Sequence, residues 1–172
     1  REEVYVDFEK TEEGSIDKQG VFLVLGEKKH IDPYLAAVET AKFTTVATEP
    51  SFASAARIIA VSGGEDFEES NLLMNISGEG MYSAVLRSGA VRFTRFTGFG
   101  GGIGATIVAN EAKKILNFYN SSRSGEGDDI RGVFVFGDEI TSSSFVEVIA
   151  KMLEIPARML DVEKMLLEGM HI

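Results

Sequence analysis

Short hydrophobic runs predict the strands of the first part of the chain. The runs are rich in β-branched and aromatic residues and are bounded by polar or glycine-containing segments. They lie at residues 4–8, 20–26 and 43–47. The polar stretch 11–19 predicts a hairpin-like loop, and apolar residues at helical spacing follow Pro33 and Pro50, with Asp32 as the N-cap of the first helix. Residues 1–61 are therefore predicted to form a small β-β-α-β-α subdomain.

A polar loop over residues 62–70, with two glycines and four acids, forms the best internal boundary. Three strand candidates follow, joined by turns so short that they favour antiparallel hairpins. They lie at residues 72–76, 81–86 and 90–96. Helix, strand, helix and a last short strand come next, at residues 103–119, 133–136, 144–152 and 155–159, before a candidate helix at 161–168. Residues 71–172 thus have the β-β-β-α-β-α-β order of a ribonuclease-H-like unit, an α/β fold with a mixed sheet in which 133–136 runs parallel to 72–76.

Composition limits the classes of function. The chain of 172 residues has no cysteine, so disulfides and thiolate chemistry are excluded. Its 27 acids and 17 bases give a net charge of −10, which repels nucleic acid. No apolar run approaches the roughly 20 residues of a membrane span, and no signal peptide is visible. We expect a cytoplasmic location and, because the chain begins at Arg1, a piece of a longer protein.

Two segments carry candidate chemistry. Residues 100–105 fit the pattern G-x-G-x-x-A of dinucleotide sites, but the strands before them predict an antiparallel meander, and no acid stands about 20 positions on at the end of the next strand. A flexible turn is the competing interpretation. Asp138 and Glu139 follow a buried strand, where open α/β sheets bind ligands, although acids also favour a helix start. Neither histidine, and no other group of residues, has metal-ligand spacing.

Residues 72–102 resemble the actin-like ATPase domain of the PilM family of type IV pilus assembly proteins, and more distantly FtsA and the cytoplasmic part of GspL. In those families a strand ending in D-I-G meets phosphate, a hairpin turn R-x-G follows, and a further strand leads to G-G. Here Asn75-Ile76-Ser77 stands at D-I-G, Arg87-Ser88-Gly89 at the turn, Gly100-Gly101-Gly102 at the glycines and Gly137-Asp138 at a second G-G. The resemblance implies a nucleotide-binding edge composed of Asn75, Ser77, Gly78, Gly101, Gly102, Gly137 and Asp138.

Departures from the family pattern argue against ATP hydrolysis. Asn75 lacks the charge that would help to hold a hydrated Mg²⁺. Ser77 adds a side chain where backbone would approach phosphate, and Asp138 brings a negative charge towards the nucleotide. The family's adenine-contacting E-x-x-K helix is missing. We therefore expect no cofactor in this chain, while ATP and Mg²⁺ stay open for the full-length protein.

The resulting hypothesis is a non-catalytic scaffold of type IV pilus or type II secretion assembly, peripheral to the inner membrane on its cytoplasmic side. The resemblance implies partners such as the cytoplasmic tail of an inner-membrane assembly protein; self-association is left open. The first half is predicted to bind the partner along an unpaired strand edge, through Val4, Val6, Phe22 and Val24. An active actin-like ATPase and a dinucleotide-dependent enzyme are the alternatives.

Overall fold

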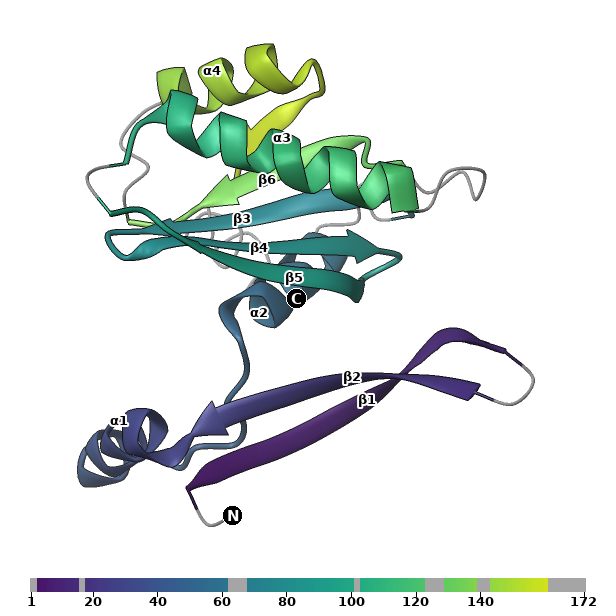
Figure 1. The fold of residues 1–172 in the computed structure, drawn as a ribbon. Helices are drawn as coiled ribbons and strands as arrows, with labels where there is room; N and C mark the ends of the chain where they lie inside the picture. The colour runs from purple at the N-terminus through teal and green to yellow at the C-terminus, as the bar shows by residue number, and fades with distance from the viewer. Residues whose placement is uncertain are drawn as a thin grey trace. The chain divides into compact units, whose positions relative to one another are not determined.

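The computed structural model describes residues 3–15, 18–61, 68–100, 103–122, 129–138 and 143–160 (Figure 1). The chain divides into two compact units between Glu49 and Pro50. The helix predicted at 161–168 lies outside the described residues. No described helix is long and apolar enough to cross a membrane.

The first unit is a two-stranded antiparallel sheet followed by one helix. β1 (Val4–Ser15) pairs with β2 (Lys18–Glu27), with Val4 opposite Glu27 and Lys10 opposite Val21. The strands extend through most of the segment predicted as a loop, because ladder hydrogen bonds join backbone groups and do not require apolar side chains. In Figure 1 the two strands form a long twisted ribbon, with α1 (Lys28–Thr40) at the end where β2 finishes.

Two local predictions in this unit are wrong. α1 begins at Lys28, so Asp32 does not cap it and Pro33 lies inside the helix. The helix starts early because the backbone passes directly from β2 into α1 at Glu27, which makes no side-chain cap bond. Residues 43–47 do not form a strand, and Phe43 and Val46 are exposed. A β-rich segment becomes a strand only where another strand pairs with it.

The second unit contains a five-stranded mixed sheet in the order β5-β4-β3-β6-β7. The strands are β3 (Asn71–Ser77), β4 (Gly80–Arg87), β5 (Ala90–Gly98), β6 (Gly132–Phe136) and β7 (Ala157–Met159). β3, β4 and β5 are successively antiparallel, whereas β6 runs parallel to both β3 and β7. The predicted meander and the predicted parallel pairing are both confirmed.

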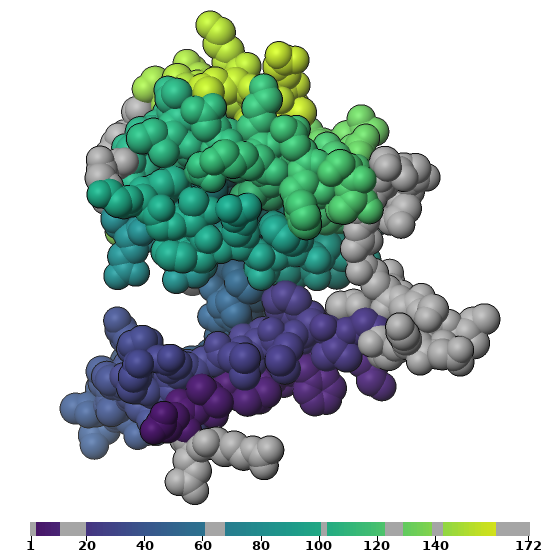
Figure 2. All heavy atoms as spheres, viewed as in Figure 1, coloured from purple at the N-terminus to yellow at the C-terminus, as the bar shows by residue number. Residues whose placement is uncertain are grey.

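Helices cover both faces of this sheet (Figure 1). α3 (Ala105–Ser122) and α4 (Ser143–Leu153) lie side by side on one face, and their atoms form a continuous surface in Figure 2. α3 buries the predicted helical stripe Val108, Ala112, Ile115 and Tyr119 against Leu72, Met74 and Ile76 of β3.

The other face of the sheet is covered in part by α2 (Ser51–Val61). Ala55, Ala56 and Ile59 of α2 pack in one cluster with Leu73 and Phe134 of the sheet. α2 therefore belongs to the second unit, whereas the sequence pattern placed it in a subdomain 1–61. The periodicity correctly gives the apolar face of the helix but cannot say which sheet receives it.

Candidate functional site

One edge of the five-stranded sheet collects most of the residues to which the resemblance assigns nucleotide binding. The register places the ends of β3, β5 and β6 beside the start of β4, with Ser77 opposite Gly80, Gly80 opposite Gly98, and Asn75 opposite Phe136. We call this side of the sheet the carboxyl edge.

Five predicted site residues lie on this carboxyl edge or directly beyond it. They are Asn75, Ser77, Gly78, Gly137 and Asp138. The tract that contains Gly101 and Gly102 follows β5, but these two glycines lie outside the described residues. The topology thus brings together the ends of β3 at Ser77 and β6 at Phe136, which are 59 residues apart in the sequence, because parallel neighbours finish at the same side of a sheet.

Gly137 has a clear packing role at the carboxyl edge. Its φ of +125° lies in a region that L-residues with a side chain rarely adopt. A Cβ at Gly137 would collide with the backbone oxygen of Ile76, and it would stand 2.7 Å from the backbone nitrogen of that residue. Glycine is therefore required at this position, because the backbone that follows β6 packs directly against the β3 backbone.

The Asn75 side chain makes a hydrogen bond inside the second unit. Its Nδ2 donates a hydrogen bond to Ser51 Oγ over 3.0 Å, which ties the end of β3 to the start of α2. A carboxylate could only accept in this contact, so the hydroxyl would have to turn to donate. At Ser77, the hydroxyl donates to the backbone oxygen of Gly80 over 3.4 Å, across the β3–β4 turn that holds Gly78.

Aromatic side chains flank Asn75 on the same face of the sheet. The register aligns Phe136, Asn75, Tyr82 and Phe96 in one row across β6, β3, β4 and β5. The Tyr82 and Phe96 ring centroids are 4.4 Å apart, and both side chains are nearly half exposed. Sequence reasoning missed Phe96 and Ser51, although alternation along residues 90–96 could have placed Phe96 on this face.

The charge at the carboxyl edge is unfavourable for phosphate. Asp138 and Glu79 are both exposed there, on the β6 end and in the β3–β4 turn. Among the described residues, no group of three or more His, Asp or Glu could hold a metal ion. An anionic ligand would thus meet an amide, aromatic rings and two carboxylates at this edge.

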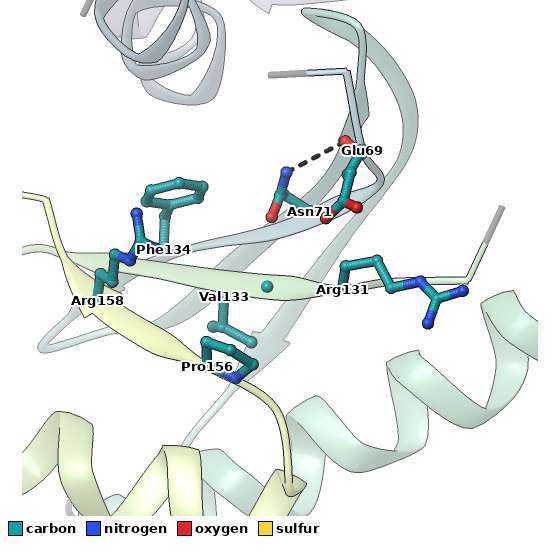
Figure 3. Close-up of a pocket in the computed structure, with 8 residues that line it drawn as sticks. Glu69, Asn71, Arg131, Val133, Phe134, Pro156 and Arg158 are labelled. Carbon is teal, nitrogen blue, oxygen red and sulfur yellow. Dashed lines mark hydrogen bonds between the residues drawn. The ribbon is translucent and has the colours of Figure 1, made fainter. Parts of the chain in front are cut away.

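A small pocket lies at the opposite edge of the sheet, beside the starts of β3 and β6 (Figure 3). Glu69, Asn71, Arg131 and Arg158 line it together with Pro156. The Asn71 amide donates to the Glu69 backbone oxygen over 3.1 Å, and the Arg131 backbone N–H donates to Ser70. None of the predicted site residues lines this pocket.

The predicted partner-binding residues lie on both strands of the first unit but not on one face. Val4 and Val6 face the same side as Leu25, which is opposite Val6, whereas Phe22 and Val24 point to the other side and are partly buried. Within the described residues, β1 and β2 form a sheet of only two strands, and no other strand pairs with the outer side of β1. The use of a strand edge by a partner stays a prediction.

Tyr5 of β1 contacts α1 at the end of this hairpin. The Tyr5 hydroxyl donates to Asp32 Oδ1 over 2.8 Å, and the Lys28 ammonium lies 5.2 Å from the Tyr5 ring centroid. The hydrogen bond to Asp32, with smaller contributions from desolvation and the carboxylate charge, raises the pKa of Tyr5. The ion pair with Lys29, 2.7 Å away, lowers the pKa of Glu27.

The chain resembles solved structures but matches no sequence family. No protein-family model matches the sequence, and no curated protein matches it significantly. A chain of the PilM–PilN type IV pilus biogenesis complex matches with a TM-score of 0.71 and 12% identity, over 95% of this chain and 58% of that chain. The ethanolamine utilization protein EutJ from Carboxydothermus hydrogenoformans matches with a TM-score of 0.50 and 15% identity, over 74% and 55% respectively.

This chain therefore spans a little over half the length of each matched structure, at 58% and 55%. The strand order of the second unit is that predicted for a ribonuclease-H-like unit. Taken together, the strand order and the structural likeness show that the chain has an actin-like ATPase fold of the PilM type.

Proposed function

We propose that this chain is a non-catalytic, actin-like scaffold of a type IV pilus or type II secretion assembly. It would bind partner proteins at the cytoplasmic face of the inner membrane. The proposal that the chain does not hydrolyse nucleotide rests on the side chains present at the carboxyl edge. At this edge Asn75 donates a hydrogen bond to Ser51, and the exposed Tyr82–Phe96 pair lies beside it. Nucleotide hydrolysis would instead require a bound metal ion and preorganised hydrogen-bond donors.

The likeness to a chain of the PilM–PilN complex supports a role in pilus assembly. The dinucleotide alternative loses support, because it requires a strand–helix–strand opening in a parallel sheet, whereas residues 100–105 follow a strand that is antiparallel to its neighbour. The ATPase alternative rests on loops that this chain does not supply.

The two-stranded sheet of the first unit is the surface that we assign to the partner. Among the described residues no strand pairs with the outer side of β1, so an extended tail can add a third strand there. Such β-augmentation takes affinity from backbone hydrogen bonds and specificity from alternate side chains. The expected partner is the extended cytoplasmic tail of a membrane-anchored assembly protein.

A pull-down with such a tail tests this role. Val6→Pro removes one β1 N–H and should lower tail recovery at least severalfold if β1 is the accepting edge. Val46→Pro, in the irregular segment before α2, is the matched control and should recover as much tail as wild type. Circular dichroism first establishes that both variants are folded. Equal recovery by both variants would exclude the β1 edge, and a wild type that retains no tail would contradict the scaffold role.

A further inference from the structure

One face of the β1–β2 sheet is apolar, and no described element of the first unit covers it. Along this face the register places residues of both strands in opposite pairs, Val6 with Leu25, Phe8 with Leu23 and Lys10 with Val21. Five apolar side chains of this face are each more than half exposed, namely Val6, Phe8, Val21, Leu23 and Leu25. We call these five residues the apolar face.

The opposite face of the same sheet is different. Asp7 and Glu9 give it charge, and Phe22 and Val24 are partly buried. α1 lies on this opposite face, at one end, where Ile31 contacts Gly26 and Tyr5 binds Asp32. The one helix described in this unit therefore leaves the apolar face open.

Exposing an apolar face to water lowers the stability of so small a sheet. A two-stranded hairpin is marginally stable in water unless its apolar side packs against something. Contiguous exposed apolar residues on a soluble protein mark an interaction surface. The five side chains alternate along both strands, so they form one pleated surface suited to packing face to face with another sheet.

The charges at the two ends of the apolar face are opposite. Lys10 ends it on one side, and Glu27, which is opposite Val4, ends it on the other. No charged residue lies between them on this face. Glu27 pairs with Lys29, and His30 Nδ1 lies 3.6 Å from the same oxygen, but the Glu27 side chain is still 52% exposed and accessible to a further cation.

We propose that the apolar face joins two copies of the chain around a two-fold axis, with their hairpins antiparallel. In that arrangement Val6 of one copy meets Phe8 of the other and Leu23 meets Leu25, while Lys10 of each copy lies beside Glu27 of the other. The surface is self-complementary, as a two-fold interface requires. This interface uses side chains on the face of the sheet, whereas the partner site proposed above uses the backbone groups along the β1 edge. Val6 belongs to both surfaces, so the variants below are placed on β2.

The proposed interface is small, so its affinity should be low. It involves eight face positions in each copy, whereas stable complexes use roughly 20–30 residues a side. We therefore expect a weak, concentration-dependent dimer. Sedimentation equilibrium of the wild-type chain should show an average mass that rises with concentration towards twice the 18.7 kDa of the monomer.

Paired charge variants test the geometry. Leu23→Lys/Leu25→Lys and Leu23→Glu/Leu25→Glu should each raise the dissociation constant at least about tenfold, because like charges would meet in an apolar contact. An equimolar mixture of the two variants should recover dimers that neither forms alone. Val46→Lys, at an irregular position that is 96% exposed, should associate like wild type.

Cross-linking gives a second measurement that does not depend on stability. The chain has no cysteine, so any thiol cross-link of a single-cysteine variant joins two copies. Facing sheets lie about 10 Å apart, beyond the reach of a disulfide, so a short bis-maleimide is the suitable reagent. Leu23→Cys should cross-link well above Asp7→Cys on the opposite face. A wild type that stays monomeric, variants that associate unchanged, or equal cross-linking at both positions would overturn the proposal.

Discussion

At the residue scale, the carboxyl edge shows that a glycine in a functional pattern can have a structural cause. The resemblance links Gly137 to nucleotide binding, whereas the structure gives it a φ of +125° and a position against the Ile76 backbone. Asn75 likewise has a partner inside the fold, Ser51. Neither contact is visible from sequence spacing, because the residues involved are 24 or more positions apart.

Gly137→Ala should destabilise the second unit by about 3 kcal/mol, since the new Cβ meets backbone and cannot be relieved by a side-chain rotation. Urea denaturation followed by circular dichroism measures the change. Gly100→Ala is the matched control, because nothing lies within 4 Å of a Cβ at that position, and it should change stability by less than about 0.5 kcal/mol. A loss as small in Gly137→Ala as in the control would refute the packing role.

At the element scale, the hairpin and α1 depend on contacts at one end. Tyr5 links β1 to α1 through Asp32, and the Lys28 backbone N–H donates to the Glu3 oxygen at the same end. Local patterning predicted a later start for α1, at Asp32 and Pro33. The tertiary hydrogen bond instead uses Asp32 as an acceptor inside the helix, which makes this junction sensitive to pH.

The Tyr5–Asp32 contact should stabilise the first unit until strongly alkaline pH. The folded state raises the pKa of Tyr5, so its stabilising contribution is complete below the ordinary value of 10.0 and is lost as the pH rises through the folded-state pKa. The difference in unfolding free energy between wild type and Tyr5→Phe should stay constant from pH 7 to pH 9 and shrink above about pH 10. Urea titrations across this range measure it.

Tyr34→Phe is the matched control, because it removes a hydroxyl from an exposed side chain on α1. Its difference from wild type should not change over the same range. If Tyr5→Phe and Tyr34→Phe behave alike, the hydrogen bond to Asp32 contributes nothing measurable to stability.

At the scale of the whole molecule, the mixed sheet brings the ends of β3, β5 and β6 to one edge. That edge is where an actin-like fold would meet a nucleotide, and here it presents Asn75, an aromatic pair and Asp138. This edge belongs to the second unit and the hairpin to the first. The function proposed above accordingly places partner contacts on the first unit.

Isothermal titration with Mg-ATP and then with NAD should detect at most weak binding, and phosphate release should not exceed background. The reason is the missing charge and metal ligand at Asn75. Asn75→Asp is the informative comparison, since it restores only the carboxylate and should not by itself restore turnover. Steady phosphate release that disappears when Asn75 or Gly78 is changed would establish the ATPase alternative instead.

Much of the architecture is determined by the sequence itself. Short turns and period-two patterning specify the β3–β4–β5 meander, and the stripe along α3 specifies its buried face, because these features depend on neighbours in the chain. The tertiary structure alone decides which sheet receives α2, why residues 43–47 stay irregular and which face of the hairpin is bare. These depend on residues distant in sequence: a strand needs a partner to pair with, and an apolar side chain needs a surface to cover it.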